Sequence, residues 1–275
     1  MNTQHLDGEL VTAGVDWLTM TVLKEDATSL DLHTICVAQM QTEKGEPKEI
    51  APQGFKGYQV GGVFIGSRDD RFMFRVSGDA ARSVAQELHR HGITANCSRI
   101  DLQITFKRRR VHKDWAGELR TEIRSGRGGN GELPDITTAT YESFGRGSSV
   151  SINSRRSPRF VRIYDKSAES RGKLGENLLR VELELKKAQA QAVFNMIANG
   201  AAQEDVARSL IIGFLDLKKI PHNFKMPESG YSLPSTVYET DEEKRVAWLL
   251  RDIAPCVKKV NNPALRRKLR IAFGF

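Results

Sequence analysis

The sequence predicts an α+β fold in which helices cover one face of an antiparallel sheet. Segments with the two-residue alternation of β-strands are separated by segments with the period of an α-helix. In the most regular strand segments, apolar residues occupy one face and polar residues occupy the other. Antiparallel sheets commonly bury only one face in this way. The second face is then free for solvent or for chemistry.

The first half of the chain is expected to follow the order β-α-β-β-α-β, a split arrangement that brings its helices to one face of the sheet. Branched and aromatic residues mark the strands, and Asp79 and Gly92 are typical of the start and the end of a helix. The predicted elements are a strand over 13–23, a helix over 28–41, a hairpin over 57–67 and 71–77, a helix over 79–92 and a strand over 98–106. Alternation in the first strand sets Asp16, Leu18 and Met20 against Val15, Trp17, Thr19 and Thr21.

The second half is expected to extend the same sheet. A helix over 113–124 leads into a loop over 125–134, which has four glycines between 126 and 131. This segment lacks the Lys-Ser or Lys-Thr pair of a phosphate-binding P-loop, so we expect a surface loop. Strands near 148–154, 159–166 and 178–187 follow, and 188–219 is predicted to form two helices divided near Gly200.

Residues 1–220 are predicted to form one domain, since a chain of 275 residues can bury a core of that size. Residues 221–235 contain proline and glycine in the pattern of a linker. Residues 236–275 are expected to form a small basic helical segment, whose last helix covers 263–273.

The composition excludes several classes of protein. No apolar run approaches the roughly 20 residues that span a bilayer, and the first ten residues lack a secretory signal. We therefore expect a cytoplasmic protein with no membrane partner. The three cysteines have no C-x-x-C spacing and give no sign of a zinc or redox site. The net charge of +8 favours a polyanionic partner, most commonly nucleic acid, and a basic protein without such a partner is the alternative.

The polar face of three predicted strands gathers residues that can do chemistry. Carboxylates with an amide oxygen can hold a hard divalent cation, and a tyrosine beside them can attack a polarised phosphodiester. This combination outlines a DNA-nicking site, and an ordinary solvated sheet face is the alternative. The residues are Arg99, Asp101, Gln103 and Thr105, then Arg162, Tyr164 and Lys166, and finally Arg180, Glu182, Glu184 and Lys186.

The stretch over 148–186 resembles the replication initiation factor family, together with GVDWLTMTV at 14–22 and SRIDLQITF at 98–106. Its most specific part is a serine-arginine-rich hairpin that leads into RIYDK and then into an R-x-E-x-E strand. The family includes rolling-circle initiators of small plasmids and filamentous phages, and related relaxases of integrative elements. The implied fold is Rep-like, similar to that of HUH endonucleases, although the His-hydrophobe-His motif of the commoner relaxases is absent from this sequence.

The resemblance implies an enzyme that nicks one DNA strand at an origin. Tyr164, the tyrosine of RIYDK, would attack a phosphate in single-stranded or extruded hairpin DNA and leave a 5′-phosphotyrosine and a free 3′-hydroxyl. Lys166 and Arg162 would assist it. A host polymerase would extend the free end, and a host helicase and a second copy of the chain are further expected partners. The cofactor would be Mg²⁺ or Mn²⁺, with Asp101, Glu182, Glu184 and Gln103 as ligands.

Two basic clusters at strand ends are expected to converge on this site, where phosphate contacts position DNA. The predicted DNA-binding residues are Arg155, Arg156 and Arg159, then Arg108, Arg109 and Arg110, and also Arg180, Arg266 and Arg267.

Two other functions stay open at this point. Ser151 and Asn153 stand where members of the family often have tyrosine and glycine, which keeps open a non-catalytic protein that recognises an origin or operator. A metal-dependent nuclease that uses water is the other alternative, and it would leave no covalent protein-DNA adduct.

Overall fold

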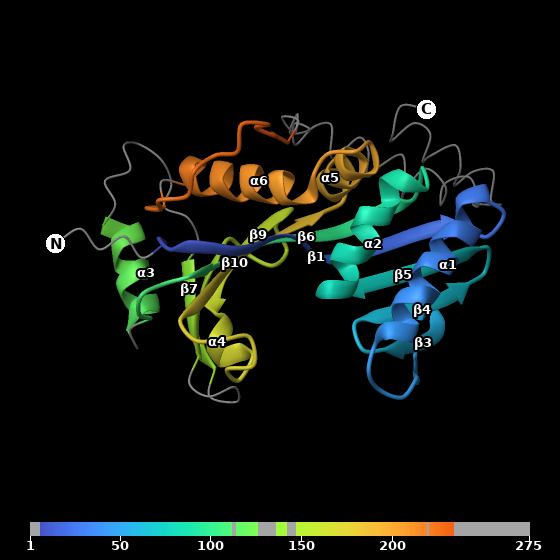
Figure 1. Cartoon of the computed structure of the whole chain (residues 1–275), viewed down its shortest axis with the longest axis horizontal. Helices are drawn as coiled ribbons and strands as arrows, with labels where there is room; N and C mark the ends of the chain where they lie inside the picture. Colours follow the sequence, from blue (N-terminus) through green and yellow to red (C-terminus); the bar gives the residue numbers. More distant parts are fainter. Residues whose placement is uncertain (1–5, 112–113, 126–135, 142–146, 219, 234–275) are drawn as a thin grey trace, which may run out of the picture. The chain divides into compact units, whose positions relative to one another are not determined.

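The computed structural model describes residues 6–111, 114–125, 136–141, 147–218 and 220–233 (Figure 1). The chain divides into two compact units, Met1–Leu233 and Pro234–Phe275. All the elements below belong to the first unit. The predicted basic helical segment, with Arg266 and Arg267, lies outside the described residues, as does most of the predicted glycine-rich loop.

The first unit is built on a ten-stranded sheet in which every neighbouring pair of strands is antiparallel. The spatial order is β2-β3-β4-β5-β1-β6-β10-β9-β8-β7, so β1, β6 and β10 lie in the middle. The strands are β1 (Glu9–Leu23), β2 (Lys48–Ile50), β3 (Lys56–Val60), β4 (Val63–Arg68), β5 (Arg71–Ser77), β6 (Asn96–Lys107), β7 (Ile136–Tyr141), β8 (Gly147–Ile152), β9 (Arg159–Asp165) and β10 (Leu178–Lys186).

Helices cover one face of this sheet, as predicted. In Figure 1, α2, α5 and α6 lie on the same side of the central strands. Helix α1 packs against α2, β4 and β5, whereas the short helix α4 packs against β8 and β10. None of the described helices is long and apolar enough to cross a membrane. The helices are α1 (Ala27–Thr42), α2 (Asp79–Arg90), α3 (Trp115–Ser125), α4 (Lys166–Glu169), α5 (Ala188–Ala198) and α6 (Gln203–Leu217), and a 3₁₀ turn covers Pro52–Gly54.

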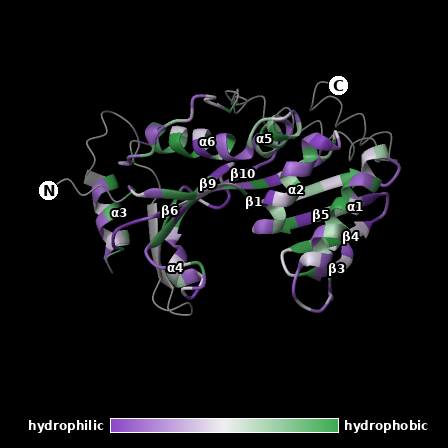
Figure 2. Ribbon diagram, viewed as in Figure 1, coloured by the Kyte–Doolittle hydropathy of each residue, from purple (hydrophilic) through white to green (hydrophobic). Residues whose placement is uncertain are grey.

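The core lies between these helices and the apolar sheet face. Alternate residues of the central strands are fully buried, among them Leu102 in β6 and Val181 in β10. They pack against helical residues such as Phe194 and Ile211. Each such side chain contributes about 1.5–3 kcal/mol by burial. Figure 2 shows hydrophobic and hydrophilic residues along the same strands. The polar residues lie on the sheet face opposite these helices, here called the open face, where those of β6 and β10 such as Asp101 and Glu182 are themselves only 6% and 8% exposed.

Three predictions of secondary structure were wrong in detail. The segment 57–67 forms two strands, because Gly61 turns the chain with φ of 52°. The edge strands β2 and β7 were not anticipated. Strand β9 ends at Asp165, whose side chain accepts a hydrogen bond from the Ala168 amide and caps α4. Lys166 is therefore the first residue of a helix and not the last residue of a strand.

A bulge in β1 also differs from the prediction. The pairing of β1 with β6 shifts register between Val15 and Trp17, so Asp16 leaves the buried row of Leu18 and Met20. The Val15 amide donates a 3.1 Å hydrogen bond to Gln203 of α6. As a result, Asp16 and Trp17 both stand on the open face, beside the predicted site.

The described part of the predicted linker packs on the sheet unit. Leu6 forms a parallel bridge with His222, and the rings of Phe106 and Phe224 have centroids 5.0 Å apart. Tyr231 and Leu233 also pack against the core. The division into compact units falls after Leu233. A linker over the whole of 221–235 stays a prediction.

Candidate active site

The predicted polar residues do share one face of the sheet, because the strand register aligns them in cross-strand rows. Asp101 of β6 lies opposite Glu184 of β10. The next row is Gln103, Glu182 and Arg162, and the third is Thr105, Arg180 and Tyr164. Strand β8 adds Ser149 beside Tyr164 and Ser151 beside Arg162. The alternation of the sequence therefore predicted this face correctly.

Tyr164 is directly bonded to a carboxylate. Its hydroxyl group donates a 2.5 Å hydrogen bond to Glu182 Oε1, and only 6% of the residue is exposed. Burial, and after it the negative charge of Glu182, raises the pKa of Tyr164 above its ordinary value. The tyrosine is thus a neutral phenol with a proton acceptor already in place.

Cations surround this pair. The Arg162 guanidinium lies 4.5 Å from the centroid of the Tyr164 ring and donates a 2.7 Å hydrogen bond to Glu182 Oε2. Lys166 Nζ lies 5.7 Å from the same centroid and pairs with Glu169 at 2.7 Å. The three predicted catalytic residues are therefore neighbours. The Ser149 side chain is buried next to them, and its hydroxyl group makes no hydrogen bond among the described residues.

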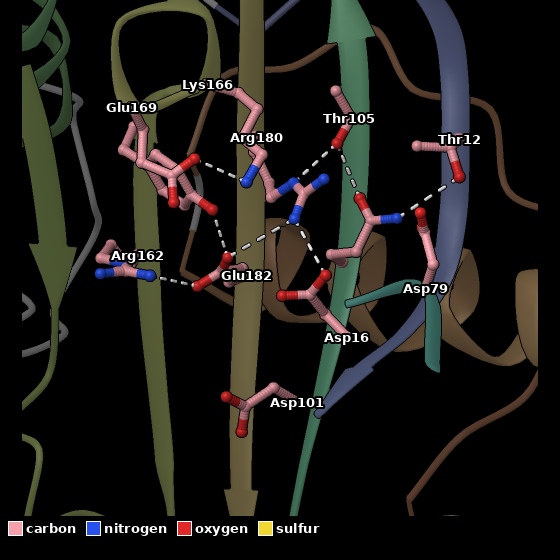
Figure 3. A network of polar contacts seen from close by, with 12 residues as sticks. Thr12, Asp16, Asp79, Asp101, Thr105, Arg162, Lys166, Glu169, Arg180 and Glu182 are labelled. Carbon is pink, nitrogen blue, oxygen red and sulfur yellow. Dashed lines mark hydrogen bonds and ion pairs between the residues drawn. The ribbon is translucent and has the colours of Figure 1, made fainter. Parts of the chain in front are cut away.

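Arg180 is buried within the network and joins it to β1. Its Nε donates to Thr105 at 2.8 Å and its Nη1 donates to Asp16 at 2.9 Å (Figure 3). Burial raises the pKa of Asp16, and the Arg180 charge opposes that shift. Asp16 was missed because strict alternation places it in the core, and the only local signal is Gly14 before the bulge, with φ of 141°. Arg180, predicted to contact DNA, is 6% exposed and orders the sheet face.

The four predicted metal ligands do not come together as one cluster. Arg99 binds both oxygens of Asp101, at 2.8 and 2.5 Å, and lies 3.0 Å from Glu184. Lys186 holds the other Glu184 oxygen at 2.6 Å. Glu182 belongs to the separate tyrosine network, and the Gln103 amide oxygen accepts a hydrogen bond from Thr105.

The chemistry of these oxygen donors suits Mg²⁺ or Mn²⁺, but their arrangement does not. Each carboxylate already has an arginine or lysine partner, and a permanently charged guanidinium between Asp101 and Glu184 competes with any cation there. Among the residues that the structure describes, no group of at least three His, Cys, Asp or Glu residues is arranged to hold a metal ion. Burial raises the pKa of Asp101 to about 6, against the effect of Arg99.

The two basic clusters do not converge, contrary to the prediction. Lys107, before Arg108 to Arg110, lies in the row of Leu178, whereas Arg159 lies in the row of Leu185 at the other end of β10. The two rows are seven residues apart along β10, which corresponds to about 23 Å. The prediction failed because it needed the direction of each strand, which the local sequence does not carry.

The individual cations of these clusters differ in setting. Arg109 and Arg110 are exposed near the Tyr164 end of the sheet, and Arg108 lies 3.3 Å from Asp7. Arg155 and Arg156 are exposed at the opposite end. Arg159 is on the helical side of the sheet, where it donates a 2.8 Å hydrogen bond to Gln189 at the start of α5.

The fold is similar to that of the rolling circle replication initiator protein from Geobacillus stearothermophilus, with a TM-score of 0.52, 15% sequence identity and coverage of 85% of this chain and 91% of that chain. No curated protein matches the sequence significantly. A family model described as replication initiation factor matches residues 112–264. Because this match spans more than half of the chain and includes the strands of Tyr164 and Glu182, the protein belongs to the replication initiation factor family.

Proposed function

We propose that this replication initiator nicks one DNA strand at its origin by transesterification with Tyr164. The observation that carries the proposal is the 2.5 Å hydrogen bond from the Tyr164 hydroxyl to Glu182, on an open sheet face with Arg162 and Lys166 alongside. A phenol is a weak nucleophile until a base removes its proton. Glu182 supplies that base at hydrogen-bond distance.

The proposed reaction begins when the Tyr164 oxygen attacks the scissile phosphorus and its proton passes to Glu182. The bond between phosphorus and the 3′-oxygen breaks, and that oxygen takes up a proton from water to become a 3′-hydroxyl group, while Glu182 returns its proton to solvent. The 5′-phosphate stays on Tyr164, so the reverse attack by a 3′-hydroxyl group can reseal the strand. The raised pKa of Tyr164 favours proton transfer during the attack over a preformed phenolate.

Nearby donors can stabilise the phosphorane-like transition state. Lys166 pairs with Glu169, which is 46% exposed in its side chain, so a phosphate oxygen can replace that carboxylate at little cost. Arg162 is held over the ring by Glu182 and presents a second cation. The Ser149 hydroxyl, which has no partner among the described residues, is a further donor beside the tyrosine.

A divalent cation is general among initiators of this family, and we keep Mg²⁺ or Mn²⁺ as a proposal. No step above passes through the ion, because the described carboxylates are arranged as ion pairs with arginine and lysine. Extension of the free 3′-end by a host polymerase, unwinding by a host helicase and action as a homodimer belong to the same proposal.

The test is incubation of the full chain with single-stranded and supercoiled DNA carrying the candidate origin of its own element, with Mg²⁺, Mn²⁺ or a chelator. Denaturing electrophoresis then separates protein-DNA adducts. We expect a covalent adduct with wild type and none with Tyr164→Phe. Tyr58→Phe is the matched control, since Tyr58 is 57% exposed in β3 and lies away from this network.

Each other outcome overturns the proposal in a defined way. Cleavage without an adduct would identify a nuclease that uses water. Origin binding without cleavage by wild type would identify the non-catalytic recognition protein. An adduct that survives in Tyr164→Phe would move the nucleophile to another residue.

A further inference from the structure

We propose that the open face of β1 and β5, beside the proposed nicking site, binds the single-stranded substrate, with Trp17 as a base-stacking surface and Arg75 as a phosphate contact. This proposal rests on the proposed function and gives its substrate a place on the sheet. The proposal rests on arginine side chains that lie against aromatic rings next to the row of Asp101. The proposed nicking chemistry does not use this part of the face.

Trp17 stands at the centre of this surface. Its half-buried ring is on the open face, opposite the buried Leu18, and the strand pairing places Trp17 between Asp101 of β6 and Ser77 of β5. Its Nε1 donates a 2.8 Å hydrogen bond to Thr19, which fixes the ring orientation. The Arg99 guanidinium lies 4.9 Å from the Trp17 ring centroid and that of Arg75 lies 5.5 Å from it. A ring held in one orientation can stack on a base, while the cations on either side of it contact the phosphates that flank that base.

Arg75 differs from the other arginines of this face. It lies 5.4 Å from the Phe64 ring centroid and donates a 3.0 Å hydrogen bond to Gln59. Among the described residues it has no carboxylate partner, whereas Arg99 binds Asp101 and Glu184. Burial, and after it the nearby charge of Arg99, lowers the pKa of Arg75. An anionic ligand would supply the missing counter-charge.

One DNA strand bound at this surface can also reach Tyr164. Trp17 is in the row of Asp101 and Glu184, and Tyr164 is in the row of Thr105 and Arg180. Three inter-strand spacings and four residues along the strands separate the two by about 20 Å. A single strand several nucleotides long can span that distance along the open face.

Single-stranded DNA fits better than duplex DNA for a chemical reason. Bases in a duplex are stacked on one another and do not offer their faces to a tryptophan. Unpaired bases stack on aromatic side chains without a strong sequence preference, and arginines beside the ring hold the backbone. An exposed sheet that carries aromatic rings is a known platform for unpaired nucleic acid.

The test measures binding without cleavage. Every variant is made in the full chain that carries Tyr164→Phe, and fluorescence anisotropy follows a labelled single-stranded origin oligonucleotide and the same sequence as a duplex. We expect Trp17→Leu to weaken single-strand binding roughly tenfold to a hundredfold, while duplex binding changes less than about twofold. Trp17→Phe should retain most of the affinity because it keeps a ring. Tyr58→Leu is the control, since this exposed aromatic side chain is on the other face of the sheet.

The salt dependence of binding tests the role of Arg75 separately. Arg75→Gln should reduce the slope of log affinity against log salt for single strands by about 0.7, the value for one phosphate contact. Arg90→Gln, which removes an exposed cation of α2, should leave that slope unchanged. Thermal melting checks that each variant is folded.

The outcomes separate this inference from the proposed function. If folded Trp17→Leu and Tyr58→Leu bind single strands equally well, the stacking surface is wrong, whatever Tyr164 does. If Trp17→Leu loses single-strand affinity but wild type forms no covalent adduct, the surface stands and the nicking chemistry fails.

Discussion

Glu182 is the residue on which the proposed proton transfer depends, because it receives hydrogen bonds from both Tyr164 and Arg162. Glu182→Gln keeps the shape of the side chain and removes its basicity. We expect the rate of adduct formation to fall by roughly 10²- to 10⁴-fold, the usual contribution of a general base. The measurement is single-turnover adduct formation on origin DNA.

Glu169→Gln is the control for Glu182→Gln, since Glu169 is an exposed carboxylate that pairs with Lys166. It should change the rate far less. A folded Glu182→Gln variant with a rate within tenfold of wild type would mean that Glu182 only positions the tyrosine.

Asp101 makes stability depend on pH. Burial raises its pKa in the folded protein to about 6, from 3.8 for the free side chain. Because the folded pKa is the higher one, this group stabilises the fold most below pH 3.8, and its contribution is lost as the pH rises through about 6. A shift of this size corresponds to about 3 kcal/mol at most.

Asp101→Asn should therefore flatten the dependence of unfolding free energy on pH between about 4 and 7. Urea denaturation of the two proteins at several pH values measures this effect. Equal pH slopes for wild type and Asp101→Asn would show that Asp101 does not carry the linkage. Asp165→Asn is a useful comparison, because Asp165 caps α4 away from the Arg99 pair.

At the scale of elements, the regular strands were predictable and the irregular one was not. The alternation in β6, β9 and β10 identified the open face because β10 pairs with both neighbours without a register shift, which keeps the two-residue period. The β1 bulge is accompanied by a hydrogen bond to Gln203, 188 positions away from Val15, and Gly14 is its only local signal. The Arg99–Asp101 ion pair lies within β6, but the pairing of Arg99 and Lys186 with Glu184 depends on side-chain contacts that alternation alone does not give, which explains why a metal cluster was predicted there.

Gln203 ties three elements together and is expected to hold the bulge. Its side chain accepts from the Val15 amide in β1 and donates to the Arg82 carbonyl oxygen in α2. Gln203→Ala should lower the unfolding free energy by about 1–3 kcal/mol, because it removes the hydrogen-bond partner of the amide of the buried Val15. Gln86→Ala, at an exposed position of α2, is the control. Equal stability of both variants in urea denaturation would contradict this role.

At the scale of the whole molecule, the charge of +8 and the sheet pattern predicted the class of fold and partner, whereas the domain limits stay a prediction. The domain was predicted to end at residue 220, and the compact unit extends to Leu233. The reason is that Phe224, Tyr231 and Leu233 pack on the core, while the prolines and glycines around them have the composition of a linker. DNA contacts by Arg266 and Arg267 stay a prediction.

Two truncations test this limit. A chain that ends at Leu233 should unfold cooperatively, whereas one that ends at residue 220 should melt at least about 5 °C lower. It loses the partly buried side chains of Phe224, Tyr231 and Leu233, each of which contributes part of the about 1.5–3 kcal/mol of full burial. Differential scanning calorimetry compares them. Equal melting temperatures would place the end of the stable unit at residue 220.

Tyr164 belongs to β9, which is hydrogen-bonded to β8 on one side and β10 on the other. A DNA end joined to Tyr164 would thus be attached to an inner strand of a ten-stranded sheet. A pulling force on the DNA would act on the backbone hydrogen bonds that hold β9 to its two neighbours. The attached DNA end would not be carried by a loop, because Tyr164 is part of β9. During resealing the protein would act as a stationary anchor, and the DNA would have to travel to it.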